Sequence, residues 1–192
     1  AALACGVLER GLMPVVVSGP VAIEYPVGAE VHNVITTDEM LSVCRELFAG
    51  CIGVIGAAAP CDFRSLSPSD EKIHKSSDSV TSGYVNKISL EFVETPDILR
   101  SLAEVKHAEQ WIVAFALETH NCYERALQKL KRKGADYIAL NNVSAIDAHQ
   151  TRLELMDGAG KIVKTFTGEK LVVARELLSF LCDEGKMGTG DG

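Results

Sequence analysis

Short apolar runs alternate with longer amphipathic segments along most of the chain. Runs typical of buried strands lie at Pro14–Ser18, Val31–Ile35, Cys51–Ile55, Trp111–Phe115 and Asp136–Leu140. The segments that separate them repeat their apolar positions at the spacing of a helix. Strands that alternate with helices favour a parallel sheet with helices on both faces. The pattern therefore predicts an α/β fold of the Rossmann-like, doubly wound type, with a mostly parallel sheet.

Local signals mark the helices. Thr36 or Thr37 is expected to cap a helix that continues to Phe48, and Thr95 to cap another, with Pro96 at its first helical position. Further helices are expected at Ala1–Arg10 and Asn121–Arg132, and a half-buried strand at Lys87–Val93. The first helix has no strand before it, which is unusual for this fold.

The C-terminal part departs from the alternation. Thr151–Met156 and Lys161–Phe166 are strand-like runs around a glycine-rich turn, which predicts a β-hairpin. Gly168–Cys182 follows as an amphipathic helix. No linker divides the chain, so we expect one domain over residues 1–182 and a flexible tail over residues 183–192.

Composition narrows the function classes. The formal charge of −7, from 19 basic and 26 acidic residues, disfavours a nucleic-acid or anionic membrane partner. No apolar run approaches the length of a membrane-spanning helix. The six cysteines are spread along the chain without the spacing of a metal site, which favours reduced thiols and a cytoplasmic protein. No metal-ligand cluster is expected.

The candidate chemistry begins after the strand Cys51–Ile55. This strand leads into Gly56–Ala59, four small residues whose backbone a ligand can approach closely. Asp62 is suited to orient a ligand or a metal-bound phosphate, and its alternative role is to cap a turn. Cys61 is more readily explained as a packed small residue than as a nucleophile.

Two basic clusters are candidates for binding phosphate. Lys72, His74 and Lys75 lie on a polar stretch that follows the small residues. Lys131 and Lys133 lie at the end of a predicted helix, where cations also complement the helix dipole. Together these groups suit a site that holds a triphosphate and a second phosphorylated substrate.

Six segments, in order along the chain, resemble the motifs of one family. They are Val15–Val21 for T-L-V-S-G-P-V, Gly56–Arg64 for A-A-A-V-A-D-Y/F-R, Glu71–Lys75 for E-K-I-K-K, Thr95–Leu99 for N-P-D-I-L, Phe115–Thr119 for G-F-A-A-E-T, and Lys131–Asp136 with Asn141–Ser144 for R-K-G-x-D and N-D-V-S. The family is phosphopantothenate–cysteine ligase of coenzyme A biosynthesis. The resemblance runs nearly end to end.

The resemblance implies a homodimeric enzyme that activates 4'-phosphopantothenate with CTP and Mg²⁺, releasing pyrophosphate. Cysteine then attacks the acyl-cytidylate, and phosphopantothenoylcysteine and CMP leave. The hairpin over Thr151–Phe166 matches the family's subunit-contact region. No nucleic-acid or membrane partner is implied.

The resemblance also implies roles for single residues. Lys72 would stabilise the acyl-nucleotide as the catalytic residue. The nucleotide-binding residues would be Ala58, Ala59, Asp62, Phe115, Lys131 and Lys133, and the residues for the other substrate would be His74, Lys75 and Asn141.

Several departures keep other functions open. The family's first strand, T-x-G-G-T-x-E, and its N-x-S-S-G loop have no counterpart here, and His74, Thr95 and Asn142 replace a lysine, an asparagine and an aspartate of the motifs. A homologue that binds nucleotide or a partner without catalysis is the alternative. An oxidoreductase is poorly supported, because neither G-x-G-x-x-G nor Tyr-x-x-x-Lys occurs.

Overall fold

The sheet that organises the molecule has five strands in the order β3-β6-β7-β8-β9. In the computed structural model, which describes residues 1–69, 71–72, 89–117, 122–141 and 151–184, β3, β6 and β7 are parallel and β8 and β9 complete the sheet as an antiparallel hairpin. The strands are β3 (Gly53–Gly56), β6 (Trp111–Leu117), β7 (Tyr137–Asn141), β8 (Thr151–Asp157) and β9 (Ile162–Gly168). The α/β fold with its mostly parallel centre and C-terminal hairpin is confirmed.

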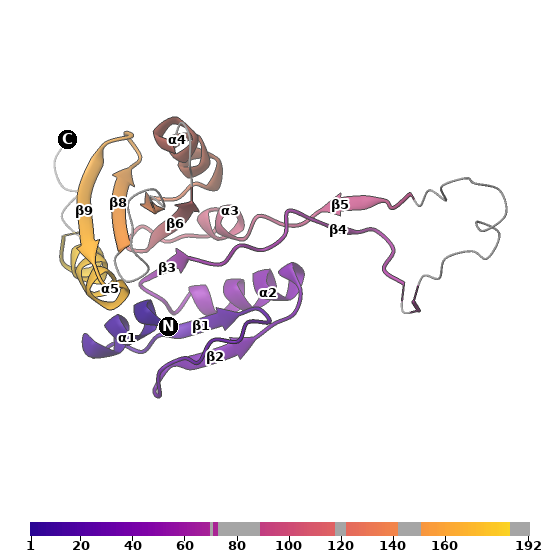
Figure 1. Ribbon diagram of the computed structural model, residues 1–192, viewed down its shortest axis with the longest axis horizontal. Coiled ribbons are helices and arrows are strands. Elements are labelled where there is room, and N and C mark those ends of the chain that lie inside the picture. The colour runs from indigo at the N-terminus through magenta and orange to yellow at the C-terminus, as the bar shows by residue number, and fades with distance from the viewer. Residues whose placement is uncertain (70, 73–88, 118–121, 142–150, 185–192) are drawn as a thin grey trace.

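Helices cover both faces of this sheet (Figure 1). They are α1 (Ala2–Glu9), α2 (Thr37–Phe48), α3 (Ile98–Ala103), α4 (Cys122–Lys133), α5 (Lys170–Ser179) and the π-helical turn η3 (Phe180–Glu184) that extends α5. On one face, Phe48, Leu102 and Leu130 of α2, α3 and α4 share a core with Ile138. On the other face, Leu177 of α5 packs with Phe166. Two helical layers thus enclose the sheet, as predicted.

Two further strands form a separate parallel pair. β1 (Val15–Ser18) pairs with β2 (Glu30–Asn33), and neither is bonded to the five-stranded sheet. Among the described residues, β1 and β3 therefore each keep one edge without a partner strand. The β3 residues remain partly exposed, whereas Ile112–Ala114 of the neighbouring β6 are buried. The sheet is less continuous than the alternation suggests, because β1 and β2 are not hydrogen-bonded to β3.

A two-stranded arm extends away from the sheet (Figure 1). It consists of β4 (Phe63–Ser65) and β5 (Phe92–Glu94), which are antiparallel. Of the strand predicted at Lys87–Val93, only its end belongs to β5, and the segment before residue 89 lies outside the described residues. β4 was not predicted from the sequence.

The helix signals were right in one case and wrong in another. Thr36 caps α2 as predicted: its hydroxyl accepts the backbone N–H of Glu39 and the Glu39 carboxylate accepts the N–H of Thr36. The prediction for Thr95 was wrong, because α3 begins later and its N-cap is Asp97. Thr95 instead donates its hydroxyl to the carbonyl of Cys61 and so joins the two sides of the arm at its base. The boundary predicted for the tail, residues 183–192, was wrong, because residues 183–184 belong to η3; residues 185–192 lie outside the described residues.

No helix in the described part of the chain combines the length and apolar character needed to cross a membrane. The cysteines with described side chains, Cys5, Cys44, Cys51, Cys61 and Cys182, are free thiols.

Candidate functional site

The carboxyl ends of three parallel strands meet at one edge of the sheet. β3 ends at Gly56, β6 at Leu117 and β7 at Asn141. Ligands of open α/β sheets bind beyond this edge. The structure therefore brings Ala58, Ala59, Phe115 and Asn141 to the same edge, although they are up to 83 positions apart (Asn141 minus Ala58) in the sequence.

The small residues at the end of β3 have two different explanations. A Cβ atom on Gly56 would lie 2.6 Å from Cδ1 of Leu99, so glycine lets the Leu99 side chain of α3 pack directly on the strand. Ala57, Ala58 and Ala59 are exposed beyond the strand end. Gly56 is thus explained by packing, whereas the alanines leave an accessible backbone on which a ligand can rest.

Phe115 and Asn141 face the same side of the sheet. Leu117 pairs with Asn141, and Phe115 pairs with Ala139 two residues earlier on β7. Alternate residues of a strand point to the same face. Phe115 is half-buried against the α5 side of the core, and Leu117 is 67 % exposed. An aromatic ring, an exposed apolar side chain and an amide therefore form one surface at the edge.

Asp62 and Lys72 lie before and after β4, the first strand of the arm. The backbone N–H of Thr95 donates to the carbonyl of Asp62 (2.9 Å), which places Asp62 at the base of the arm. Lys72 follows β4 and is exposed. The arm projects from the body (Figure 1), and no hydrogen bond or ion pair of the described residues joins Lys72 to the edge residues. His74 and Lys75 lie outside the described residues.

Lys131 and Lys133 lie at the opposite edge of the sheet. α4 leaves the carboxyl end of β6 and leads to the amino end of β7, so its last turn is far from Asn141. They line a shallow cavity of about 470 Å³. The Lys133 ammonium donates to the Asp97 carboxylate (2.8 Å), whereas Lys131 is exposed. The structure thus separates both lysines from the other predicted nucleotide-binding residues.

The Asp97–Lys133 pair makes stability depend on pH. Burial raises the pKa of Asp97, but the hydrogen bonds from Lys133 and from the N–H of Arg100 outweigh it, so the pKa is held below its usual value. A depressed carboxyl pKa contributes stability that is present above the ordinary value of about 3.9 and is lost as the pH falls through the folded value.

We expect Lys133→Met to lower the free energy of unfolding by about 1 kcal/mol at pH 7. The difference from the native chain should shrink as the pH falls below about 4. Urea unfolding across this pH range measures it. Lys131→Met is the matched control and should change little at any pH; an equal loss in both variants would contradict the role of the pair.

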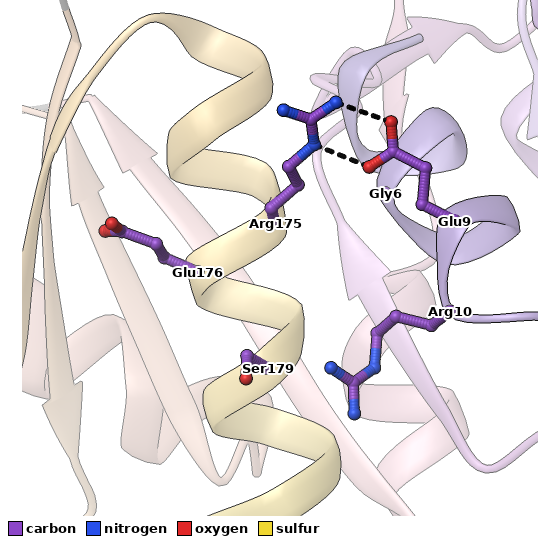
Figure 2. A pocket seen from close by; sticks show the side chains of 6 residues that line it. All are labelled: Gly6, Glu9, Arg10, Arg175, Glu176 and Ser179. Carbon is purple, nitrogen blue, oxygen red and sulfur yellow. Dashed lines mark hydrogen bonds and ion pairs between the residues drawn. The ribbon is translucent and has the colours of Figure 1, made fainter.

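A second cavity, of about 320 Å³, lies between α1 and α5. Figure 2 shows Arg175 of α5 reaching Glu9 of α1, with two hydrogen bonds of 2.5 and 2.6 Å. A Cβ atom on Gly6 would lie 2.8 Å from Cδ1 of Leu178, so the helices pack closely at this glycine. Arg175 pairs with Glu9 within this cavity and Arg10 pairs with Asp183 beside it, and we assign the cavity to helix packing.

A buried carboxylate near the edge was not among the predicted site residues. Glu154 of β8 is 8 % exposed and accepts hydrogen bonds from Tyr123 (2.7 Å) and Arg152 (2.7 Å). The Tyr123 hydroxyl, followed by Arg152, holds the pKa of Glu154 below its usual value despite burial. In the sequence, Glu154 stands between Leu153 and Leu155, so the alternation predicts only that its side chain points to the face opposite the two leucines. The alternation gives no sign that the carboxylate is buried or hydrogen-bonded.

The described residues contain no group of three or more histidine, cysteine, aspartate or glutamate side chains that could hold a metal ion. Asp62 is the carboxylate nearest to the small residues in the sequence. A Mg²⁺ ion typically uses one or two carboxylates together with substrate phosphates and water. Asp62, as a single carboxylate, is therefore suited to a Mg²⁺ ion whose other ligands are nucleotide phosphates and water.

Comparisons with known proteins agree on one family. The model of the family described as the DNA/pantothenate metabolism flavoprotein C-terminal domain matches residues 1–183. The coenzyme A biosynthesis bifunctional protein CoaBC of Haemophilus influenzae is 32 % identical over 157 residues, which are 80 % of this chain and 37 % of that protein. The CoaBC protein of Escherichia coli K12 is 34 % identical over 143 residues, 74 % of this chain and 34 % of that protein.

A solved structure agrees as well. The crystal structure of the C-terminal domain of CoaBC superposes with a TM-score of 0.71 at 27 % identity, covering 94 % of this chain and 78 % of that one. The chain spans little more than a third of the length of these curated relatives.

Proposed function

Because the chain belongs to the DNA/pantothenate metabolism flavoprotein C-terminal domain family, we propose that it is a phosphopantothenate–cysteine ligase of coenzyme A biosynthesis. The observation that carries the proposal is the family match over residues 1–183, which includes every predicted site residue. The meeting of Ala58, Ala59, Phe115 and Asn141 at the carboxyl edge supports it.

The proposed reaction has two steps. The carboxylate of 4'-phosphopantothenate attacks the α-phosphorus of CTP and pyrophosphate leaves. The amino group of cysteine then attacks the acyl carbon, CMP leaves, and an amide forms after loss of a proton. Positioning and charge neutralisation account for most of the catalysis in such transfers. When bound with the nucleotide, Mg²⁺ would offset phosphate charge, and Asp62 is the residue we propose beside it.

The residues of the edge have separate proposed roles. The exposed backbone of Ala58 and Ala59 lines the nucleotide, and Phe115 packs against it. Lys72 supplies positive charge to the acyl-nucleotide. Lys131 and Lys133 are not included, because α4 ends at the opposite edge of the sheet. His74 and Lys75 keep their proposed role at the second substrate.

The first experiment is a turnover assay. The chain is incubated with 4'-phosphopantothenate, Mg²⁺ and CTP or ATP, with and without cysteine, and pyrophosphate and nucleoside monophosphate are measured. The proposal expects CMP release that depends on cysteine. Binding of CTP without turnover would instead favour the second candidate, a non-catalytic homologue, which the altered motif positions His74, Thr95 and Asn142 support.

We also propose a homodimer and assign its contact to the arm. Phe63 pairs with Glu94 and Ser65 with Phe92, so Phe63 and Phe92 lie on one face of the two strands. They are 57 % and 59 % exposed, and Leu66 and Leu90 nearby are exposed as well. An isolated two-stranded arm with an apolar face is marginally stable by itself. The predicted contact at Thr151–Phe166 stays a prediction; β9 exposes mainly Lys164, Thr165 and Thr167.

Replacing Phe92 by serine is expected to weaken the dimer by at least about 30-fold, since truncating a central aromatic contact typically costs about 2 kcal/mol or more. Sedimentation velocity over a concentration series measures the change. Val172→Ser, at an exposed apolar residue of α5, is the control. Unchanged association of the Phe92 variant would remove the arm from the proposed interface.

A further inference from the structure

Glu154 is a carboxylate at a position where an apolar side chain would pack as well. It is 8 % exposed and faces the α4 side of the sheet together with Met156. It pairs across the sheet with Leu140, and both Leu140 and Met156 belong to the buried cluster that contains Leu130 of α4. Burying a carboxylate is unfavourable, and replacing buried charged groups by apolar residues of similar volume is often neutral or stabilising. Stability by itself therefore does not explain a glutamate at this position.

The two hydrogen-bond donors on this carboxylate have different consequences. Arg152 lies two residues earlier on the same strand and donates to Oε1 (2.7 Å), so its bond orients the carboxylate without joining β8 to another element. Tyr123 lies in the first turn of α4 and donates its hydroxyl to Oε2 (2.7 Å). The Tyr123 bond therefore connects the hairpin strand β8 to the start of α4.

The start of α4 closely follows the candidate site along the chain. β6 ends at Leu117 and α4 begins at Cys122, so positions 118–121 alone separate the two elements. Leu117 is held by its pairing with Asn141 of β7, and the bond between Tyr123 and β8 holds the start of the helix. The carboxylate of Glu154 thus fixes where α4 begins at the edge that carries the proposed site.

We propose that Glu154 is a positioning residue of the ligase reaction, which holds the first turn of α4 through Tyr123 in the place that substrate binding requires. This inference rests on the proposed function. Glu154 does not act on the substrates directly, because both of its oxygens already accept hydrogen bonds. A turn that is fixed beforehand spares the substrate the entropy of ordering it. Loss of the bond should therefore raise KM and leave kcat, as for an interaction that is equally strong in the ground state and the transition state.

Steady-state kinetics of Glu154→Leu test the inference. Leucine fills a similar volume, and Tyr123 (48 % exposed) and the exposed Arg152 can turn their donors to water. The KM for CTP should rise about tenfold, the factor that one hydrogen bond to a charged group supports, with kcat within about twofold of the native value. Partial unfolding would remove active enzyme and lower the apparent kcat instead, so the split between KM and kcat separates positioning from lost stability.

Three further variants make the result specific. Glu154→Gln keeps an acceptor for the Tyr123 hydroxyl and should keep KM within about threefold of the native value. Tyr123→Phe removes the same bond from α4 and should match Glu154→Leu, and the double variant should show no further rise. Arg175→Met breaks the pair with Glu9 between α1 and α5, away from this edge, and should leave KM unchanged.

The outcomes separate this inference from the proposed function. A native KM in Glu154→Leu, or a rise that Glu154→Gln shares in full, would overturn the inference and leave the ligase intact. If Glu154→Leu fails to fold, which circular dichroism shows, Tyr123→Phe decides in its place.

Absence of turnover in the native chain would overturn the proposed function, and amide hydrogen exchange then judges the anchor by itself. The N–H of Ala126, which an α-helix bonds to the carbonyl of Cys122, should exchange about tenfold faster in Glu154→Leu, whereas the N–H of Leu130 should not change. Equal exchange of Ala126 in both chains would overturn the inference whatever the activity.

Discussion

Lys72→Ala is expected to lower kcat for cysteine-dependent CMP release by about 100- to 1,000-fold. Removing one group that stabilises developing negative charge in an active site typically has this effect. The proposed acyl-cytidylate carries negative charge on its phosphate, and Lys72 is the described lysine of the basic segment that resembles the family's flap. The loss should appear mainly in kcat, because the nucleotide also rests on Phe115 and the alanine backbone.

Two variants make this result specific. Lys164→Ala removes an exposed lysine from β9 and should leave kcat unchanged, because β9 lies at the far edge of the sheet from β3. Lys72→Arg keeps the charge but not the shape of the ammonium group, and should recover part of the rate. A Lys72→Ala enzyme with the native kcat would exclude Lys72 from catalysis and direct attention to Lys75.

The elements that could be predicted are those with local signals. The capping box of Thr36 and Glu39, the glycine-rich turn of the hairpin and the apolar run of β6 each lie within a few residues. The arm was not predicted as a pair, because β4 and β5 meet only through contacts between distant segments. For the same reason Thr95 was predicted to cap a helix, whereas its hydroxyl donates a hydrogen bond to the carbonyl of Cys61 at the base of the arm.

The candidate site could be predicted only where topology fixes it. Parallel strands place their carboxyl ends at one edge, so Ala58, Phe115 and Asn141 follow from the order of the elements. Lys131 and Lys133 are close to β7 in the sequence, but a helix that leads into a strand ends at the strand's amino end. The Oδ1 atom of Asn141 is buried without a hydrogen-bond partner among the described residues, and this depends on the packing of its neighbours, which no sequence pattern encodes.

Gln110→Met is expected to lower the free energy of unfolding by about 3 kcal/mol, because it removes three hydrogen bonds to backbone groups at about 1 kcal/mol each. Gln110 is 7 % exposed, and its amide donates to the carbonyls of Phe48 (2.6 Å) and Cys51 (2.7 Å). Its carbonyl accepts the N–H of His107 (3.0 Å). Methionine has nearly the same length and volume but makes none of these bonds.

The consequence reaches the candidate site, because these bonds hold the turn between α2 and β3, and β3 carries the alanines of the edge. Urea unfolding should show a lower midpoint with an unchanged m-value. Gln128→Met makes the same change on the exposed side of α4 and should cost less than about 0.5 kcal/mol. If Gln110→Met were as mild as this control, the turn would be held by its backbone alone, and the amide of Gln110 would not be what positions β3.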